Sequence, residues 1–152
     1  MVKDRDIEDV VKDVLNSDDF FIVGIQNKQD TIKVIVDGYK GIDLDKCGEI
    51  TRKLRSSFGE KVDDYNIEVT SPGLTSAFQV IEQYKKNIGQ KVETLLKTGE
   101  KITGKLQEVN PESILLEEKK RIKTDKNKKK TVREEKTIKF DEIKYTKLII
   151  SF

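Results

Sequence analysis

The sequence predicts an α+β protein of two units: an N-terminal α/β layer, then a helix that leads into a small five-stranded β-barrel. Apolar residues recur first at helix and strand spacings in the order helix, strand, strand, helix, strand, and then as one helix and five strands. A Ser-Pro-Gly segment interrupts the chain near its middle. Residues 1–70 carry 11 Lys and Arg against 16 Asp and Glu, whereas residues 71–152 carry 19 against 12. We therefore predict domains at 1–73 and 74–152.

The first unit is predicted to contain two helices and three strands. Acidic residues begin the first helix, where they complement the helix dipole, and residues 7–15 supply one apolar face. Residues 20–26 and 31–37 are rich in β-branched and aromatic side chains and flank a polar loop at 27–30, which predicts a hairpin. The second helix starts after Asp43 as N-cap and ends at Gly59, and alternation over 65–69 predicts the third strand. The predicted inner face of the second helix comprises Leu44, Cys47, Thr51, Leu54 and Phe58, and its basic face comprises Lys46, Arg52, Lys53 and Arg55.

Ser71, Pro72 and Gly73 form the predicted turn between the two units. Pro72 fixes φ near about −65° and biases Ser71 towards extended backbone, while Gly73 can adopt a positive φ. Ser71 to Leu74 therefore fits a type II turn. The turn either fixes how one module leaves the other or forms a ligand-binding loop, and we favour the first interpretation.

The second unit begins with a predicted helix over 76–89, which Gly89 ends. Phe78, Ile81, Tyr84 or Lys85, and Ile88 are spaced for one face of it. Turn signals then separate five strand candidates, which are 91–96, 101–109, 113–122, 129–140 and 145–152. Gly104 within the second of these suits a sharp bend, which a five-stranded sheet needs in order to close.

The chain contains no histidine, so it lacks the commonest general acid or base near neutral pH and the commonest metal ligand. Serine-histidine and cysteine-histidine nucleophile systems are excluded. Cys47 is the single cysteine, and we interpret it as a small buried residue on the second helix, because it has no partner for a disulfide or a zinc site. No spacing of Lys, Asp, Glu or Tyr singles out a catalytic pair. We expect no enzymatic activity, no metal and no cofactor.

No apolar run approaches the roughly 20 residues that cross a bilayer. The first ten residues are acidic and amphipathic, unlike a signal peptide. We therefore expect a cytoplasmic protein that does not bind membranes.

Much of the positive charge lies in residues 119–133, which hold nine basic residues and one acidic residue. Its middle, 124–130, has no apolar periodicity and is predicted to be a hairpin tip. Two interpretations stay open. The tip either binds phosphate backbones without sequence preference, or it is a solvated turn that keeps a strand edge from pairing. Because it holds no aromatic residue to stack on bases, sequence-specific recognition is not expected.

A resemblance to one known family covers most of the chain. Four motifs carry it: GIDLDKCGEITRKL (41–54), EVTSPGL (68–74), IGQKV (88–92) and TGKL (103–106). In this order and spacing they resemble the ribosome maturation factor P family (RimP), bacterial assembly factors for the small ribosomal subunit. The resemblance implies an N-terminal α/β domain and a C-terminal barrel of the Sm-like, SH3-like kind. It also implies cytoplasmic action on the immature 30S subunit, with the C-terminal domain contacting a ribosomal protein close to the decoding centre, and no catalytic step.

Two segments depart from the family pattern. After SPGL the family usually continues with Asp-Arg-Pro, where this chain has Thr75-Ser76-Ala77, so no ion pair or phosphate contact of that arginine is carried over. The lysine-rich tip at 124–130 is also longer than the family typically carries.

The function hypothesis is therefore a non-catalytic, monomeric assembly factor that binds the small-subunit precursor through a ribosomal protein, rRNA or both. The alternative is an Sm-like RNA-binding module that regulates or chaperones free RNA, and such modules usually assemble into rings. A third class, an enzyme, would need a pocket with convergent titratable groups, which the sequence does not indicate. The expected partner-binding residues are Lys91, Lys97, Lys101, Lys105, Lys128, Lys129 and Lys130.

Overall fold

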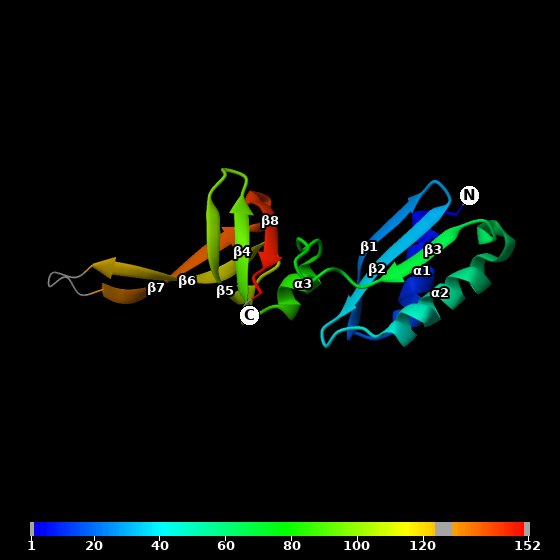
Figure 1. Cartoon of the computed structure of the whole chain (residues 1–152), viewed down its shortest axis with the longest axis horizontal. Helices are drawn as coiled ribbons and strands as arrows, with labels where there is room; N and C mark the ends of the chain where they lie inside the picture. Colours follow the sequence, from blue (N-terminus) through cyan, green and yellow to red (C-terminus); the bar gives the residue numbers. More distant parts are fainter. Residues whose placement is uncertain (1, 124–128, 151–152) are drawn as a thin grey trace. The chain divides into compact units, whose positions relative to one another are not determined.

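The computed structural model describes residues 2–123 and 129–150, and it divides into two compact units, 1–73 and 74–152 (Figure 1). Helices and strands occur in both units, which confirms the α+β class. Each unit has its own sheet and its own apolar core.

The N-terminal unit is a three-stranded sheet packed against two helices. Its elements are α1 (Asp4–Leu15), β1 (Phe20–Lys28), β2 (Thr31–Gly38), α2 (Leu44–Phe58), the 3-10 helix η1 (Gly59–Val62) and β3 (Asn66–Thr70). The strand order is β1-β2-β3, with β1 and β2 antiparallel and β2 and β3 parallel. Gln29 and Asp30 both have a positive φ between the paired residues Lys28 and Thr31. This is the pattern of a two-residue type I′ turn, so the strands extend further into the predicted polar loop than expected.

One predicted core position of α2 is wrong. Asp43 is the N-cap, its side chain accepting a hydrogen bond from the Lys46 backbone N–H at 2.8 Å, as predicted. The buried stripe runs through Cys47, Ile50 and Leu54, whereas Leu44 is 88% exposed. Leu44 lies at the first helical position, three residues before Cys47, the first buried residue of the stripe.

The predicted type II turn at Ser71-Pro72-Gly73 is not formed. The described glycines with a positive φ are Gly41, Gly59, Gly89 and Gly99, and Gly73 is not among them. Residues 71–73 have no regular secondary structure, which suits a proline and the residue before it in extended backbone. Their role in setting how the chain leaves the first unit stays a prediction.

The C-terminal unit is a five-stranded antiparallel sheet preceded by a short helix. Its elements are α3 (Ile81–Lys86), β4 (Lys91–Leu96), β5 (Lys101–Val109), β6 (Ser113–Lys123), β7 (Lys129–Lys139), the 3-10 helix η2 (Phe140–Glu142) and β8 (Ile143–Leu148). The strand order is β7-β6-β5-β4-β8, so the last strand returns to lie beside the first. The five predicted strands are confirmed. A closed barrel is not, because β7 and β8 remain the two edges of the sheet within the described residues.

The helix predicted over 76–89 is much shorter than expected, since α3 has six residues. The Phe78 backbone N–H instead donates to the Thr146 carbonyl of β8 at 2.8 Å. The Gln83 side chain accepts from the backbone N–H groups of Gln79 and Val80, as a capping-box glutamine does, and so fixes the helix start at Ile81. Ile88, predicted to lie on the inner face, is 47% exposed.

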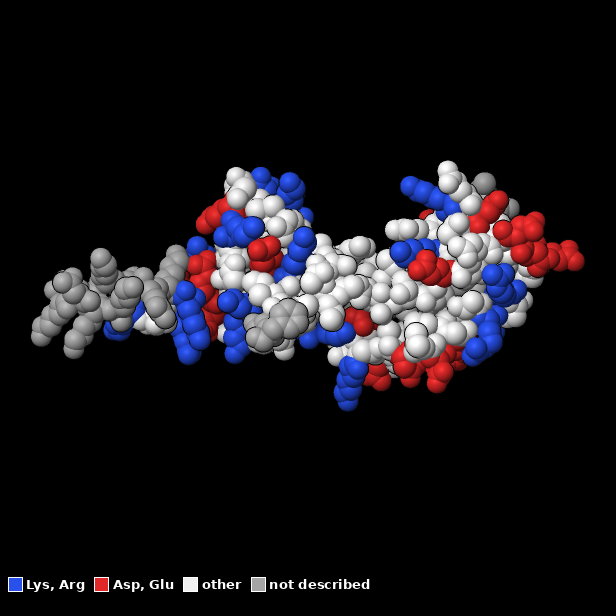
Figure 2. Space-filling model, in the orientation of Figure 1, with Lys and Arg blue, Asp and Glu red and all other residues white. Residues whose placement is uncertain are grey.

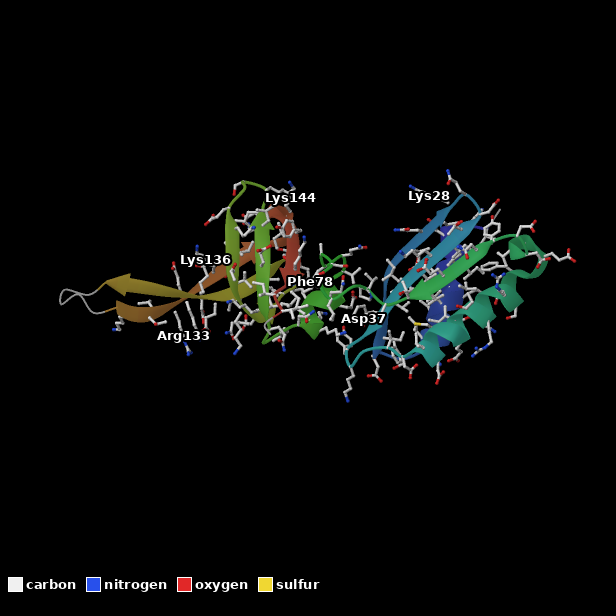
Figure 3. The ribbon with its side chains drawn as sticks, in the orientation of Figure 1. Lys28, Asp37, Phe78, Arg133, Lys136 and Lys144 are labelled. Carbon is white, nitrogen blue, oxygen red and sulfur yellow. The ribbon has the colours of Figure 1, made fainter. Side chains whose placement is uncertain are left out.

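Strands β6 and β7 form a ribbon that extends beyond the rest of the sheet (Figure 1). Strand β5 pairs with β6 only between Ile114 and Glu117, whereas β6 pairs with β7 along its whole length. Figure 3 shows Arg133 and Lys136 projecting from opposite faces of β7, as strand alternation requires. The predicted tip, including Lys128, lies outside the described residues.

Candidate nucleic-acid interface

The outer face of the C-terminal sheet carries three of the seven predicted partner-binding lysines, namely Lys91, Lys101 and Lys105. Along β5, Ile102, Gly104 and Leu106 are buried, and the residues that alternate with them are exposed. Side chains alternate across a strand, so Lys101, Thr103 and Lys105 share the outer face. Figure 2 shows Lys and Arg side chains spread over the visible side of this unit, with Asp and Glu side chains between them.

Lys91 and Lys105 are brought together by the sheet register. They are directly opposite each other on β4 and β5, and both are exposed. Like charges opposite each other in an antiparallel pair destabilise it. Neither ammonium group forms an ion pair within the described residues. The pair therefore has positive charge that an external anion would compensate.

Lys101 is already occupied by an internal contact. Its Nζ lies 3.7 Å from Oε1 of Glu93, and the Tyr145 hydroxyl donates to Oε2 of the same carboxylate at 3.2 Å. Lys147, opposite Glu93 on β8, lies with its Nζ 4.6 Å from the centre of the Tyr145 ring, which is a cation–π contact. Glu93 therefore compensates part of the positive charge here, and Lys101 has less free charge to offer an anion than Lys91 or Lys105.

Lys97 lies at the other end of the sheet from Lys91 and Lys105. It is exposed in the turn after β4, and its backbone N–H donates to the Glu142 carbonyl at 2.9 Å. Leu96 is opposite Ile143, so Lys144 of β8 lies at the same end, where Figure 3 labels it. The lysines of the first hairpin thus form two groups and not one.

The remaining predicted lysines lie on β7 and the tip. Lys130 is exposed on β7, opposite Ile122. The side chain of Lys129, like the whole of Lys128, lies outside the described residues. The structure adds Lys119 and Arg133, which are directly opposite each other on β6 and β7. Both belong to the charged run 119–133, but the bulge between Leu106 and Glu108 decides which face they occupy, and no sequence signal gives its position.

The strands under this face are held by a buried polar network. The Tyr84 hydroxyl of α3 donates to Oγ1 of Thr146 at 3.0 Å, and Thr94 Oγ1 lies 3.1 Å from the same atom. Thr94 and Thr146 are fully buried. Burial raises the pKa of Tyr84, and its hydrogen bond with Thr146 partly offsets this. The tyrosine is therefore a neutral core group at neutral pH.

The N-terminal unit offers a second basic surface along α2. A groove of about 790 Å³ lies between the end of α1 and α2, and Arg52 and Lys53 are among its lining residues. The Nζ atom of Lys46 lies 3.5 Å from Oε2 of Glu49 and 5.5 Å from the centre of the Phe20 ring. Arg55 donates to the Val62 and Tyr65 carbonyls. Two of the four predicted basic residues thus support the fold, and the groove also contains Asp13 and Glu49.

Neither unit presents a cluster with catalytic or metal-binding geometry in the part of the chain that is described. No group of three or more His, Cys, Asp or Glu side chains converges there. Burial raises the pKa of Cys47, which keeps its thiol protonated and unreactive. None of the described helices is long and apolar enough to span a bilayer.

The chain is similar to known proteins along its whole length. Residues 10–75 match the family model of the RimP N-terminal domain. Proteins named ribosome maturation factor RimP from two strains of Porphyromonas gingivalis are each 34% identical over 152 residues, covering 99% of this chain and all of the relative. A protein of the same name from Cytophaga hutchinsonii is 32% identical over 165 residues, covering 99% of this chain and 98% of the relative.

Proposed function

The chain belongs to the RimP family of ribosome maturation factors, which is a family of non-catalytic assembly factors, and from this premise we propose that it acts on the small (30S) subunit. Its role in ribosome maturation requires no chemical step. We place that role in the bacterial cytoplasm, with binding to a ribosomal protein, rRNA or both near the decoding region.

The observation that carries this proposal is the exposed charge of Lys91 and Lys105 on the outer face of the sheet, which forms no ion pair with any residue that the structure describes. Ammonium groups there gain by contact with phosphate, because each neutralised phosphate releases bound counterions. A ligand that prefers one of two conformations shifts the population towards it. A tenfold preference for the mature arrangement is worth about 1.4 kcal/mol. Binding alone is thus sufficient to favour one arrangement of a maturing particle.

We also propose that the C-terminal sheet is an open variant of the Sm-like barrel. Strand β8 pairs with β4, as the last strand of a barrel pairs with its first. In addition, Nζ of Lys136 on β7 lies 3.9 Å from Oε1 of Glu100 in the turn between β4 and β5. Gly104 supports it as well, because a Cβ there would lie 2.7 Å from the Glu117 carbonyl oxygen of β6. The missing side chain allows the close crossing that a coiled sheet needs.

We propose that the protein is a monomer. A ring of the Sm kind would pair exposed strand edges between copies. Strand β7, one of the two edges, has charged residues at seven of its eleven positions, and such charge is the usual protection of an edge against pairing. Light scattering tests this proposal, and a large oligomer would favour the alternative, a module that binds free RNA.

Co-sedimentation with immature small subunits, large subunits and whole ribosomes, at low and moderate salt, tests the main proposal. The expected result is a preference for immature small subunits that survives added salt, and that weakens in Lys91→Gln/Lys105→Gln but not in Lys139→Gln/Lys144→Gln. The proposal would be refuted if the protein bound every particle equally and added salt abolished this binding. A variant without residues 124–130 tests in the same assay whether the lysine-rich tip contributes.

A further inference from the structure

A pocket of about 420 Å³ opens on the outer face of the C-terminal sheet, across β4, β5 and β6. Each of these three adjacent strands supplies one lysine to its lining, namely Lys91, Lys105 and Lys119. We propose that this pocket binds one phosphodiester group of an RNA backbone. The proposal rests on the function proposed above and specifies the chemistry of its contact surface.

The shape of the pocket depends on the crossing of β5 and β6. Gly104 lines the pocket, and a Cβ at this position would lie 2.7 Å from the Glu117 carbonyl oxygen. The register of β5 against β6 shifts between Leu106 and Glu108, and such a bulge bends its strand. The glycine and the bulge together allow Lys119 of β6 to line the same hollow as Lys105 of β5.

The charge of the pocket is positive and not internally compensated. None of its three lysines forms an ion pair within the described residues. The pocket contains one carboxylate, that of Glu117, which is already engaged. Its Oε2 accepts from Gln107 Nε2 at 2.7 Å, and its Oε1 lies 3.5 Å from Arg133 Nε. The Glu117 side chain is 16% exposed, so it opposes an entering anion only weakly.

The donor set of the pocket favours phosphate over a carboxylate. Carboxylates are recognised best by the planar fork of arginine, whereas lysine binds phosphate as a compact point charge. Among the described residues, the lining contains lysines and the exposed Thr103, which supplies a hydroxyl, but no arginine. Its described lining residues also include no aromatic side chain, so we expect no stacking of bases there. The pocket is therefore built to recognise the backbone anion and not the sequence.

Binding of the full-length chain to a fluorescent 12-nucleotide oligouridylate across a salt series tests the proposal. The test variant is Lys91→Gln/Lys105→Gln/Lys119→Gln, and the matched control is Lys85→Gln/Lys139→Gln/Lys144→Gln, which removes the same charge from exposed lysines outside the pocket. For the test variant we expect a roughly tenfold or greater loss of affinity and a fall of about 0.7 in the slope of log K against log salt, the value for one single-strand phosphate. For the control we expect a loss of less than about threefold. Unchanged thermal unfolding of both variants shows that they fold.

Three further probes identify the ligand class. Oligodeoxythymidylate of the same length should bind within about threefold of the RNA, because the pocket reads only phosphate. Inorganic phosphate should compete with the RNA only at millimolar or higher concentration. This result would show that the pocket binds phosphate as part of a polymer backbone. A 12-residue polyglutamate should bind at least tenfold more weakly than the RNA.

The proposal is overturned by equal losses in the test and control variants, or by polyglutamate that binds as tightly as RNA with the same dependence on the pocket. Its failure is distinguishable from failure of the proposed function. Loss of oligonucleotide binding only in the test variant, together with equal sedimentation on every particle, would retain the pocket and refute the 30S assignment. Preference for the small subunit with no effect of the pocket lysines would do the reverse.

Discussion

Replacing Thr146 with valine should destabilise the C-terminal unit selectively, because its hydroxyl is the centre of a buried network. Thr146 Oγ1 accepts from the Tyr84 hydroxyl at 3.0 Å and lies 3.1 Å from Thr94 Oγ1. Valine has nearly the same shape, so the change removes the hydrogen bonds and leaves the packing. Two polar groups then remain in the core without this partner.

The expected cost follows from the desolvation of those two groups. A buried donor or acceptor that loses its partner costs about 1–3 kcal/mol. Tyr84 is 7% exposed and Thr94 is fully buried, so water has little access to either group. We expect Thr146→Val to lower the free energy of unfolding of this unit by about 2–3 kcal/mol. The triple variant Thr94→Val/Thr146→Val/Tyr84→Phe should lie within about 1 kcal/mol of the parent, since apolar replacement of all partners is nearly neutral.

Native-state hydrogen exchange on the full chain is the suitable assay, because it reports opening free energies for the two units separately. Amides of β4 and β5 should lose protection in Thr146→Val and regain it in the triple variant. Amides of α1 and β2 should be unchanged in both and serve as the internal control. A single-variant loss below about 0.5 kcal/mol, or a triple variant that loses the sum of the single losses, would refute the network as described.

Other predictions concern a glycine, the buried tyrosine and the cysteine. Gly104→Ala should destabilise the C-terminal unit by about 1–3 kcal/mol in urea unfolding, because its Cβ would press on the Glu117 backbone. Gly48→Ala should cause no such loss of stability, because its Cβ would meet only the end of the Arg52 side chain at 3.3 Å. Equal effects of the two substitutions would contradict this prediction. Because folding raises the pKa of Tyr84 from 10.0, the stability that this group supplies is intact below about pH 10 and is lost as the pH rises further. If Tyr84→Phe loses stability equally steeply above pH 10, Tyr84 is not the group responsible. Cys47 is 8% exposed and its pKa is raised by burial, so iodoacetamide at pH 8 should modify it only as fast as the N-terminal unit opens, and rapid modification of folded protein would contradict its burial.

The strands of the C-terminal unit were predictable because alternation and turn residues act locally. Strands β4 and β5 have the predicted bounds, and the Gly104 bend corresponds to a close crossing of β6. Local signals failed where a distant partner decides the conformation. Residues 78–80 belong to a segment whose apolar residues have helical spacing. The Phe78 backbone N–H nevertheless donates to the Thr146 carbonyl, 68 positions later in the chain. That bond and the Gln83 cap shorten the helix.

The candidate site was predictable in residue type but not in grouping. Exposed lysines on the first hairpin could be read from the alternation of β5. Their division into a Lys91–Lys105 pair and a separate Lys97 follows from the register, and the engagement of Lys101 by Glu93 follows from side-chain geometry. Lys119 joins the pocket through a bulge, which no apolar period announces.

The buried network and the basic face depend on the same strand register. On β4, Val92 and Thr94 are fully buried, whereas Lys91 and Glu93 occupy the opposite face. A shift of one residue exchanges the two faces of a strand, and it would bury Lys91 while exposing Val92. Thr94 and Thr146 are directly opposite each other, so their hydroxyl contact is made in only one register of β4 against β8. The network that stabilises the core therefore also fixes which lysines face outward, and a variant that weakens it should weaken the proposed RNA binding in proportion to the unfolded fraction only.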